Sequence, residues 1–365
     1  MSIGDFSVPG RLADTGEGIT GDELQLAARN HGMPLEGLRY DVTPPGLHYV
    51  LVHYDIPATA AGDWRLTVGG CVEEPLSFGL TELRAMGRRT IRVTLECAGN
   101  GRATLQPRPI SQPWLSEAVG TAEWTGVLLA DLLRLAGLRE DAVDVVFTGA
   151  DHGVERGVEQ DYQRGLSVAE AVESGAIVAW EMNGTPLPPQ HGYPLRLVVP
   201  GWYGMASVKW LRSIEVIDHE FDGYQNKVAY VLRKTPDDPG RPVTRIEPRA
   251  LLVPPGFPDF MSRHRFVAAG TVPLFGRAWS GWAPIERVEV STDAGVNWHE
   301  AKLDAPGNDE FAWRAFAYDW EATPGEHVLT VRAYDTSGRE QPIEAEWNRG
   351  GFSNNTAQRI TVLVT

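Results

Sequence analysis

A single cysteine, followed by a tight turn of small residues and then an arginine, could bind a metal ion beside an anion. The stretch runs from Thr94 to Arg102 and reads Thr-Leu-Glu-Cys-Ala-Gly-Asn-Gly-Arg. Cys97 offers a soft thiolate ligand, and Arg102 offers a guanidinium that can hold an oxyanion through paired hydrogen bonds. Gly99 and Gly101 allow a sharp bend because they carry no Cβ. These residue types predict a metal or oxyanion site, although a lone cysteine is also a common core residue.

The elements around this stretch must place it at the end of a strand. Residues 90–95, Thr-Ile-Arg-Val-Thr-Leu, predict a strand that ends just before Cys97. The prolines that follow the stretch exclude a helix there. Residues 47–54 predict another strand, on which His48 and His53 would point to opposite faces. We therefore do not expect these two histidines to bind one metal ion.

Strand-like and helix-like segments then follow one another in irregular order. Residues 143–147 and 195–199 predict buried strands, and the apolar spacing of residues 127–136, which ends at Gly137, predicts a helix. Because a regular strand–helix–strand order is missing, the fold class is α+β rather than a doubly wound parallel sheet. The sequence contains no dinucleotide-binding Gly-x-Gly-x-x-Gly motif and no P-loop.

The last third of the chain differs from the rest in composition and in its predicted elements. Residues 222–260 are rich in proline and predict a linker. From about residue 262, short strands such as 285–291 and 328–333 are separated by turn signals, which is typical of an immunoglobulin-like sandwich. We place the boundary so that residues 1–245 form a catalytic domain and residues 246–365 form the all-β sandwich, in keeping with about two domains for 365 residues.

Composition limits the partners and the compartment. The formal charge of −15 argues against nucleic acid and anionic membranes as partners. No secretory signal precedes the first domain, and no apolar run reaches about 18 residues, which predicts a cytoplasmic protein that does not enter a membrane. The two cysteines, Cys71 and Cys97, are too few for a disulfide framework and suit a reducing compartment.

Four motifs together resemble the sulfite oxidase family of molybdenum enzymes. In chain order they are Arg29-Asn30-His31, Cys97-Ala98-Gly99-Asn100, His191-Gly192-Tyr193-Pro194-Leu195-Arg196 and Ser207-Val208-Lys209-Trp210-Leu211. The resemblance covers essentially the whole chain. It implies a molybdopterin-binding first domain that uses Mo-molybdopterin as cofactor, and a second domain that forms a homodimer. The implied reaction is the oxidation of sulfite to sulfate by oxo transfer.

The resemblance also implies roles for individual residues. Cys97 would be the metal ligand, and Arg29, Arg102, Trp114 and Tyr230 would be catalytic residues around the substrate. The implied cofactor-binding residues are Ala27, Ala28, Arg29, Asn30, His31, Cys97, Asp151, His191, Arg196, Ser207, Val208 and Lys209. The chemistry agrees, because cationic and histidine side chains suit a pterin that ends in a phosphate.

Taken one at a time, these residues allow simpler interpretations. Arg196 alternates with leucines and could lie on a solvated strand face, Lys209 could be a surface lysine, and Asp151 could be a turn residue. One segment departs from the family. Residues 279–284 read Trp-Ser-Gly-Trp-Ala-Pro, whereas typical sulfite oxidases have a third anion-binding arginine after Trp-Ser-Gly. The departure bears on the substrate rather than on the cofactor.

The remaining expectations concern the electron acceptor and two alternative functions. The sequence shows no heme or flavin motif, so electrons would leave to a separate acceptor such as a cytochrome or oxygen. One alternative keeps the cofactor and reverses the chemistry, reducing a sulfoxide or nitrate. Another is a non-catalytic binding protein whose first half is only a scaffold.

Overall fold

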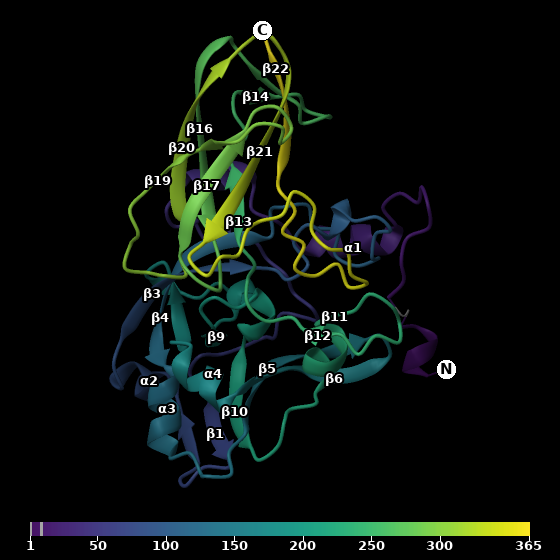
Figure 1. The fold of residues 1–365 in the computed structure, drawn as a ribbon. Helices are drawn as coiled ribbons and strands as arrows, with labels where there is room; N and C mark the ends of the chain where they lie inside the picture. Colours follow the sequence, from purple (N-terminus) through teal and green to yellow (C-terminus); the bar gives the residue numbers. More distant parts are fainter. Residues whose placement is uncertain (1, 8–9) are drawn as a thin grey trace.

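Two mixed sheets build the part of the chain that carries Cys97. The computed structural model describes residues 2–7 and 10–365, and the two sheets lie in the lower half of Figure 1. One sheet has the order β2-β1-β10-β5-β6, with β1 (Leu66–Gly70), β2 (Leu76–Phe78), β5 (Asp144–Glu155), β6 (Val158–Ser167) and β10 (Leu211–Ile217). The other has the order β3-β4-β7-β8, with β9 also paired to β7, and comprises β3 (Arg89–Glu96), β4 (Val119–Leu128), β7 (Ile177–Met182), β8 (Thr185–Pro186) and β9 (Arg196–Val198). Among these strand pairs β1 and β10 run parallel, and the others run antiparallel.

Short helices connect and flank these strands. The α-helices are α1 (Gly21–Arg29), α2 (Leu80–Ala85), α3 (Leu129–Ala136) and α4 (Val168–Glu173). Single helical turns are η1 (Ile3–Asp5), η2 (Leu35–Arg39), η3 (Arg102–Thr104), η4 (Pro189–His191), η5 (Gly204–Ala206) and η6 (Gln225–Ala229). The helix expected from residue 127 begins two residues later, because Val127 and Leu128 still pair with β7. It ends at Gly137, as its left-handed φ of +70° requires.

The second domain is a sandwich of two sheets, as expected, in the upper half of Figure 1. One sheet has the order β13-β16-β20-β19, with β13 (Arg249–Leu252), β16 (Gly270–Trp279), β19 (Lys302–Leu303) and β20 (Arg314–Ala322). The other has the order β14-β15-β22-β21-β17-β18, with β14 (Phe257–Pro258), β15 (Arg265–Val267), β17 (Ile285–Ser291), β18 (His299–Glu300), β21 (Gly325–Asp335) and β22 (Arg359–Val364). A separate small ladder pairs β11 (Val231–Leu232) with β12 (Arg241–Pro242). The α+β class with a sandwich is confirmed.

One expected strand is wrong. Residues 47–54 join neither sheet, and in this segment Val50 alone forms an isolated bridge, with His31. A turn at Pro44 begins the segment, with a hydrogen bond of 2.8 Å from the Leu47 amide to the Pro44 carbonyl. Because the segment is not pleated into a sheet, its side chains are free of strict alternation between two faces.

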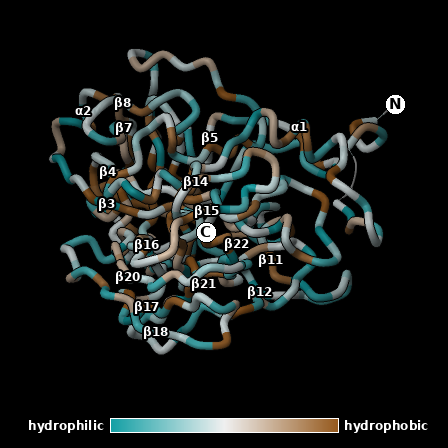
Figure 2. The backbone as a smooth tube through the Cα atoms, turned by 90° about the horizontal axis from the view of Figure 1, so that it is seen from above, coloured by the Kyte–Doolittle hydropathy of each residue, from teal (hydrophilic) through white to brown (hydrophobic). Residues whose placement is uncertain are grey.

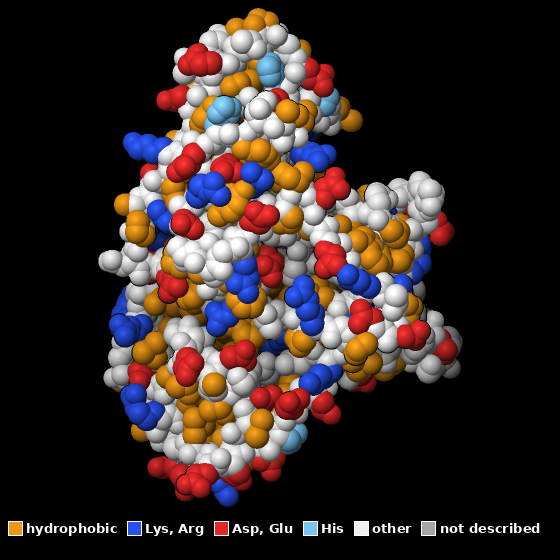
Figure 3. Space-filling model, viewed as in Figure 1, with side chains coloured by type: hydrophobic (Ala, Val, Ile, Leu, Met, Phe, Trp, Pro, Cys, Tyr) orange, Lys and Arg blue, Asp and Glu red, His pale blue; other side chains and the backbone are white. Residues whose placement is uncertain are grey.

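The two domains share their hydrophobic interior. The sandwich has its own core, but the larger core of the first domain also includes Leu251, Trp279 and Trp313 from the second. Figure 2 shows hydrophobic stretches where β3, β4, β16 and β22 run through the interior, and hydrophilic stretches in the outer loops. On the face drawn in Figure 3, acidic and basic side chains are interspersed. No helix in the described ranges is long and apolar enough to cross a membrane.

Candidate active site at Cys97

The Cys97 loop closes directly after β3. The chain reverses through a hydrogen bond of 2.9 Å from the Asn100 amide to the Cys97 carbonyl. Gly101 has a φ of +87°, in the left-handed region that favours glycine. At Gly99 an added Cβ would lie 2.6 Å from Nη2 of Arg102. The two glycines therefore serve different purposes: one makes the turn, and the other lets the arginine pack against it.

Cys97 lies where two cavities meet. An outer cavity of about 810 Å³ opens on one side of the residue, and a narrow inner cavity of about 60 Å³ lies on the other. Leu51, His53, Cys97 and Tyr230 line both cavities. Burial raises the pKa of the Cys97 thiol above its ordinary value, so a nearby cation or metal is needed to favour the thiolate.

Besides Cys97, five of the residues expected to hold the cofactor line the inner cavity. They come from β5, η4, β9 and the turn before β10, segments that are far apart in the sequence. The lining includes Asp151, His191, Arg196, Ser207 and Lys209, together with His48, which was not expected. Val208 does not line it, because its side chain is buried in the hydrophobic core.

Three of these side chains carry a buried polar atom without a hydrogen-bond partner among the described residues. They are Nε2 of His48, Nε2 of His191 and Oδ1 of Asp151. Burial lowers the pKa of His48 to about 4 and that of His191 to about 2, and it raises the pKa of Asp151 to about 6. Buried polar atoms are normally paired, so this set marks a surface that a polar ligand would complete.

Arg196 and Lys209 add positive charge to the same surface. Arg196 donates to the carbonyls of His191 and Ser207 at 3.0 and 3.1 Å, and Nζ of Lys209 donates to the Leu51 carbonyl at 2.6 Å. Burial lowers the pKa of Arg196 to about 10 and that of Lys209 to about 7. Main-chain carbonyls satisfy the N–H groups but do not neutralise the charges, so an anionic ligand such as a phosphate would stabilise both cations.

This set of groups fits a molybdopterin. The unpartnered histidine and aspartate atoms can hydrogen-bond a heterocycle, the two cations can hold its phosphate, and Cys97 offers a thiolate to the metal. The inner cavity is narrow, so the fit rests on the donors and acceptors rather than on the volume.

Arg102, Trp114 and Tyr230 line the outer cavity, where the substrate was expected. Arg102 is buried, and its Nε and Nη1 donate to the carbonyls of Gly350 and Gln112 at 2.9 and 3.2 Å. Its Nη2 has no hydrogen-bond acceptor within the described ranges and is left for a ligand. Burial lowers the pKa of Arg102 below its ordinary value, which an anion beside the guanidinium would oppose.

Four residues of the Arg29 segment lie outside the linings of both cavities. Ala27, Ala28, Arg29 and His31 are exposed at the end of α1 and line neither cavity. The guanidinium of Arg29 instead bonds to the Tyr54 carbonyl and lies 3.7 Å from the carboxylate of the exposed Asp55. Burial, and then the charges of Arg196 and Arg29, lower the pKa of Lys209, and the clamp of Arg29 and Arg102 stays a prediction.

The side chain of Asn30 is buried and forms hydrogen bonds to two other segments. Its Oδ1 accepts from the Val52 amide at 2.8 Å, and its Nδ2 donates to Gln112 at 3.0 Å. These bonds hold the segment that carries Leu51 and His53 against both cavities. Asn30 and residues 51–53 thus line the outer cavity together with Cys97.

Three further residues of the site were not expected from the sequence. The His53 ring lies 2.8 Å from the Tyr230 hydroxyl, Nε2 to O, and burial lowers its pKa to about 4. Phe352, from the second domain, packs 5.0 Å from the Arg102 guanidinium. Glu96, beside Cys97, is fully buried. Two histidines in one short apolar segment were the available signal for His48 and His53, whereas nothing local marks Phe352.

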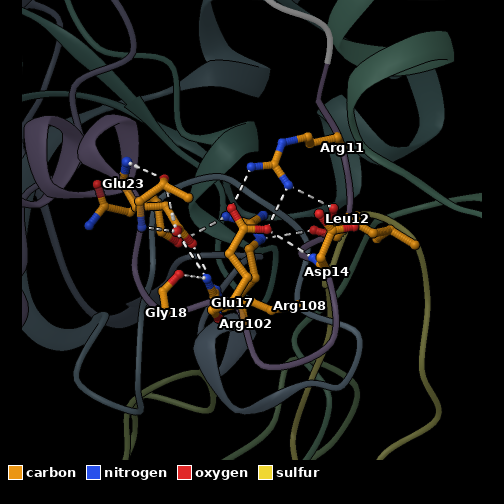
Figure 4. Close-up of polar contacts among 11 residues, drawn as sticks. Arg11, Leu12, Asp14, Glu17, Gly18, Glu23, Arg102 and Arg108 are labelled. Atoms are coloured by element: carbon orange, nitrogen blue, oxygen red, sulfur yellow. Dashed lines mark hydrogen bonds and ion pairs between the residues drawn. The ribbon is translucent and has the colours of Figure 1, made fainter.

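The N-terminal segment forms one wall of the outer cavity. Gly10, Arg11 and Leu12, and also Thr20 and Asp22, line it. Figure 4 shows the polar contacts that hold this wall. Arg11 pairs with Glu17 at 2.6 Å, and the buried Arg108 pairs with the buried Glu23 at 2.9 Å and donates to the Gly18 carbonyl at 2.7 Å.

Comparisons with known proteins agree with this geometry. Residues 53–225 match the oxidoreductase molybdopterin binding domain, and residues 258–365 match the Mo-co oxidoreductase dimerisation domain. The first match contains Cys97, Asp151, His191, Arg196, Ser207 and Lys209, whereas Arg29, His48 and Tyr230 lie outside it.

The relatives that match most of this chain include sulfite oxidases and nitrate reductases. Sulfite oxidase of Gallus gallus is 33% identical over 352 residues, which cover 87% of this chain and 72% of that protein. A nitrate reductase [NADH] of Brassica napus is 31% identical over 347 residues, and the chain spans 38% of its length. Among solved structures, the sulfane dehydrogenase SoxCD from Paracoccus pantotrophus aligns with a TM-score of 0.80 and 26% identity, covering 98% of this chain and 90% of that one.

Proposed function

Since this chain belongs to the sulfite oxidase family of molybdopterin-binding oxidoreductases, we propose that it oxidises sulfite to sulfate at the Cys97 site. In the balanced reaction, sulfite and water give sulfate, two protons and two electrons, and the electrons pass to a separate acceptor. The observation that carries the proposal is the position of Cys97 between an inner wall of unpartnered polar atoms and an outer cavity with the buried Arg102.

The inner wall would hold the cofactor. Arg196 and Lys209 would bind its phosphate, His191 and Asp151 would hydrogen-bond its heterocycle, and Cys97 would bind the metal. When bound, the molybdenum centre supplies the transfer of an oxygen atom coupled to the transfer of two electrons. Ser207 contributes indirectly, because its hydroxyl accepts from the Val199 amide at 3.1 Å and its carbonyl fixes Arg196.

The outer cavity would hold the substrate. Arg102 would bind two oxygens of the oxyanion through its free N–H groups, and Trp114 would limit the space beside Cys97. Tyr230 would donate its hydroxyl to a substrate oxygen, because burial raises its pKa well above the ordinary value and keeps it protonated. The match of the second domain to a dimerisation domain supports a homodimer.

The test is Cys97→Ser, with Cys71→Ser as the matched control. Cys71 is half buried next to β1 and lines neither cavity, so its serine variant should keep both metal and activity. We expect Cys97→Ser to lose nearly all sulfite-dependent reduction of ferricyanide, and metal analysis should show less molybdenum per chain. A Cys97→Ser protein that oxidises sulfite at the wild-type rate would rule the proposal out.

Nitrate reduction is a second candidate, because nitrate reductases are among the relatives. It uses the same cofactor with the electrons flowing in the opposite direction. Reduced viologen with nitrate or a sulfoxide, measured beside ferricyanide with sulfite, separates the two directions on one enzyme preparation.

A further inference from the structure

We propose that the outer cavity accepts an organic sulfinate, R–SO2⁻, and that the enzyme oxidises it to the sulfonate R–SO3⁻. The inference rests on the proposed function, because it keeps the same site, the same oxygen transfer and the same separate acceptor. What it adds is the class of substrate, in which one oxygen of sulfite is replaced by an organic group. Three features of the outer cavity carry it.

The first feature is size. The outer cavity has a volume of about 810 Å³, which lies within the roughly 300–1,000 Å³ typical of pockets for organic ligands. A bare sulfite ion would leave most of it to water. A substituent on sulfur would extend from Cys97 into this space and replace that water.

The second feature is charge. Arg102 is the cation that reaches the buried end of the cavity, and no carboxylate within the described ranges forms an ion pair with it. Arg11, Arg156, Arg233 and Arg349 also line the cavity. Of these, Arg11 is paired with Glu17, and Arg233 is bonded to three main-chain carbonyls. The same walls carry the carboxylates of Asp22, Glu23, Glu155 and Asp238. Arg102 therefore presents a guanidinium to an anionic group bound beside Cys97, and the single negative charge of a sulfinate suffices for that contact.

The third feature is an aromatic wall. Trp114, Tyr230 and Phe352 all line the outer cavity. The ring centroid of Phe352 lies 5.1 Å from that of Tyr230 and 5.0 Å from the guanidinium carbon of Arg102. A flat organic group attached to sulfur would pack on these rings while Arg102 binds both sulfinate oxygens.

Position 282 agrees with this interpretation. Trp282 stands where the resemblance leads us to expect an arginine, and it lines a separate groove rather than the outer cavity. The second domain therefore contributes Arg349 and the aromatic ring of Phe352 to the outer cavity, and no cation at position 282.

The chemistry balances as it does for sulfite. A sulfinate keeps a lone pair on sulfur, and sulfinate plus water gives sulfonate, two protons and two electrons. The sulfur gains one bond to oxygen, and the carbon–sulfur bond is untouched. The two electrons reduce two molecules of the one-electron acceptor ferricyanide.

The experiment compares benzenesulfinate, methanesulfinate and sulfite as substrates of the holoenzyme with ferricyanide. We expect both sulfinates to be oxidised, with kcat/KM for benzenesulfinate above that for methanesulfinate by roughly 2- to 10-fold, the size of one aromatic contact. Phe352→Leu should lower kcat/KM for benzenesulfinate more than kcat/KM for methanesulfinate, so that the preference for the aromatic substrate disappears. The control is Phe260→Leu, an exposed phenylalanine of the second domain, which should change neither value.

Binding gives a readout that is independent of turnover. Benzenesulfonate, a product, should quench tryptophan fluorescence and bind more tightly than sulfate to the wild-type enzyme, and Phe352→Leu should weaken its binding. Oxidation of sulfite but of neither sulfinate would overturn this inference and leave the proposed function standing. Failure to oxidise any of the three would overturn both.

Discussion

At the scale of single residues, the Cys97 site combines buried neutral groups with the buried guanidinium groups of Arg102 and Arg196. Burial lowers the pKa of His53 to about 4 and raises that of Tyr230 well above its ordinary value, so both are neutral near pH 7. They are joined by a hydrogen bond of 2.8 Å, and the ring of Tyr162 packs 4.9 Å from that of His53. The pair therefore fixes the position of the Tyr230 hydroxyl beside Cys97 and Arg102.

Tyr230→Phe tests this pair. The variant leaves a nitrogen of His53 buried without its partner and removes the hydroxyl from the substrate cavity. We expect kcat/KM for sulfite to fall roughly 10- to 100-fold, and stability to fall by about 1–3 kcal/mol, the cost of an unpaired buried polar group. Tyr40→Phe, at a half-exposed tyrosine far from both cavities, is the control. Unchanged kinetics in Tyr230→Phe would remove Tyr230 from the substrate site.

At the scale of elements, the end of β3 is held by the second domain. Glu96, the last residue of β3, is fully buried and lies 2.8 Å from Arg249 at the start of β13. It also accepts from the indole of Trp279 at 2.8 Å and from the side chain of Asn100 at 3.0 Å. The carboxylate thus ties the Cys97 loop to two strands of the sandwich, so the loop and the sandwich should be stable only together.

Arg249→Leu tests this connection. Removing one partner of a buried ion pair leaves an uncompensated charge, so we expect the free energy of unfolding to fall by about 3–5 kcal/mol. Arg88→Leu is the matched control, because Arg88 pairs with Glu181 at an exposed position, and such pairs contribute about 0–1 kcal/mol. Urea unfolding measures both. Equal losses in the two variants would show that Glu96 does not depend on Arg249.

At the scale of the whole molecule, three buried histidines should make the cofactor-free protein sensitive to acid. Burial lowers the pKa of His48 and His53 to about 4 and that of His191 to about 2, against an ordinary value of 6.5. Below pH 6.5 the unfolded chain binds protons at these positions, but the folded protein does not until the pH reaches its lower pKa values. The unfolded state is therefore favoured as the pH falls from about 6.5 to about 4.

The size of this effect can be measured. Each histidine should remove up to about 1.4 kcal/mol of stability per pH unit in that window. In His191→Gln the free energy of unfolding should fall less steeply with decreasing pH, because one fewer histidine takes up a proton on unfolding. His264→Gln, at an exposed position, should leave the pH dependence unchanged. The measurement is the free energy of unfolding in urea between pH 7 and pH 4. A wild-type stability that stays constant over this range would contradict the burial of neutral histidines.

Local parts of the site could be predicted from the sequence, because they depend on neighbours along the chain. The strand that delivers Cys97, the left-handed glycine at position 101 and the helix end at Gly137 follow from residue types within a few positions. The order of the motifs was enough to indicate the family, and with it the residues around the inner cavity, from Asp151 to Lys209.

Other parts of the site depend on tertiary contacts, which the spacing of residues along the sequence does not encode. Arg29 and His31 are exposed and line neither cavity, whereas Asn30 and the unpaired segment at 51–53 line the outer cavity.

What the sequence by itself determined is the chemistry of the Cys97 loop, the fold class and the family. What only the tertiary structure decided is which groups surround that loop at a distance along the chain. Phe352 and Arg249 reach it from the second domain, and His53 reaches it from a segment that pairs with no sheet. The physical reason is that turns and strands follow from local residue types, whereas the substrate wall is made by packing between segments whose separation in sequence carries no information about their contact.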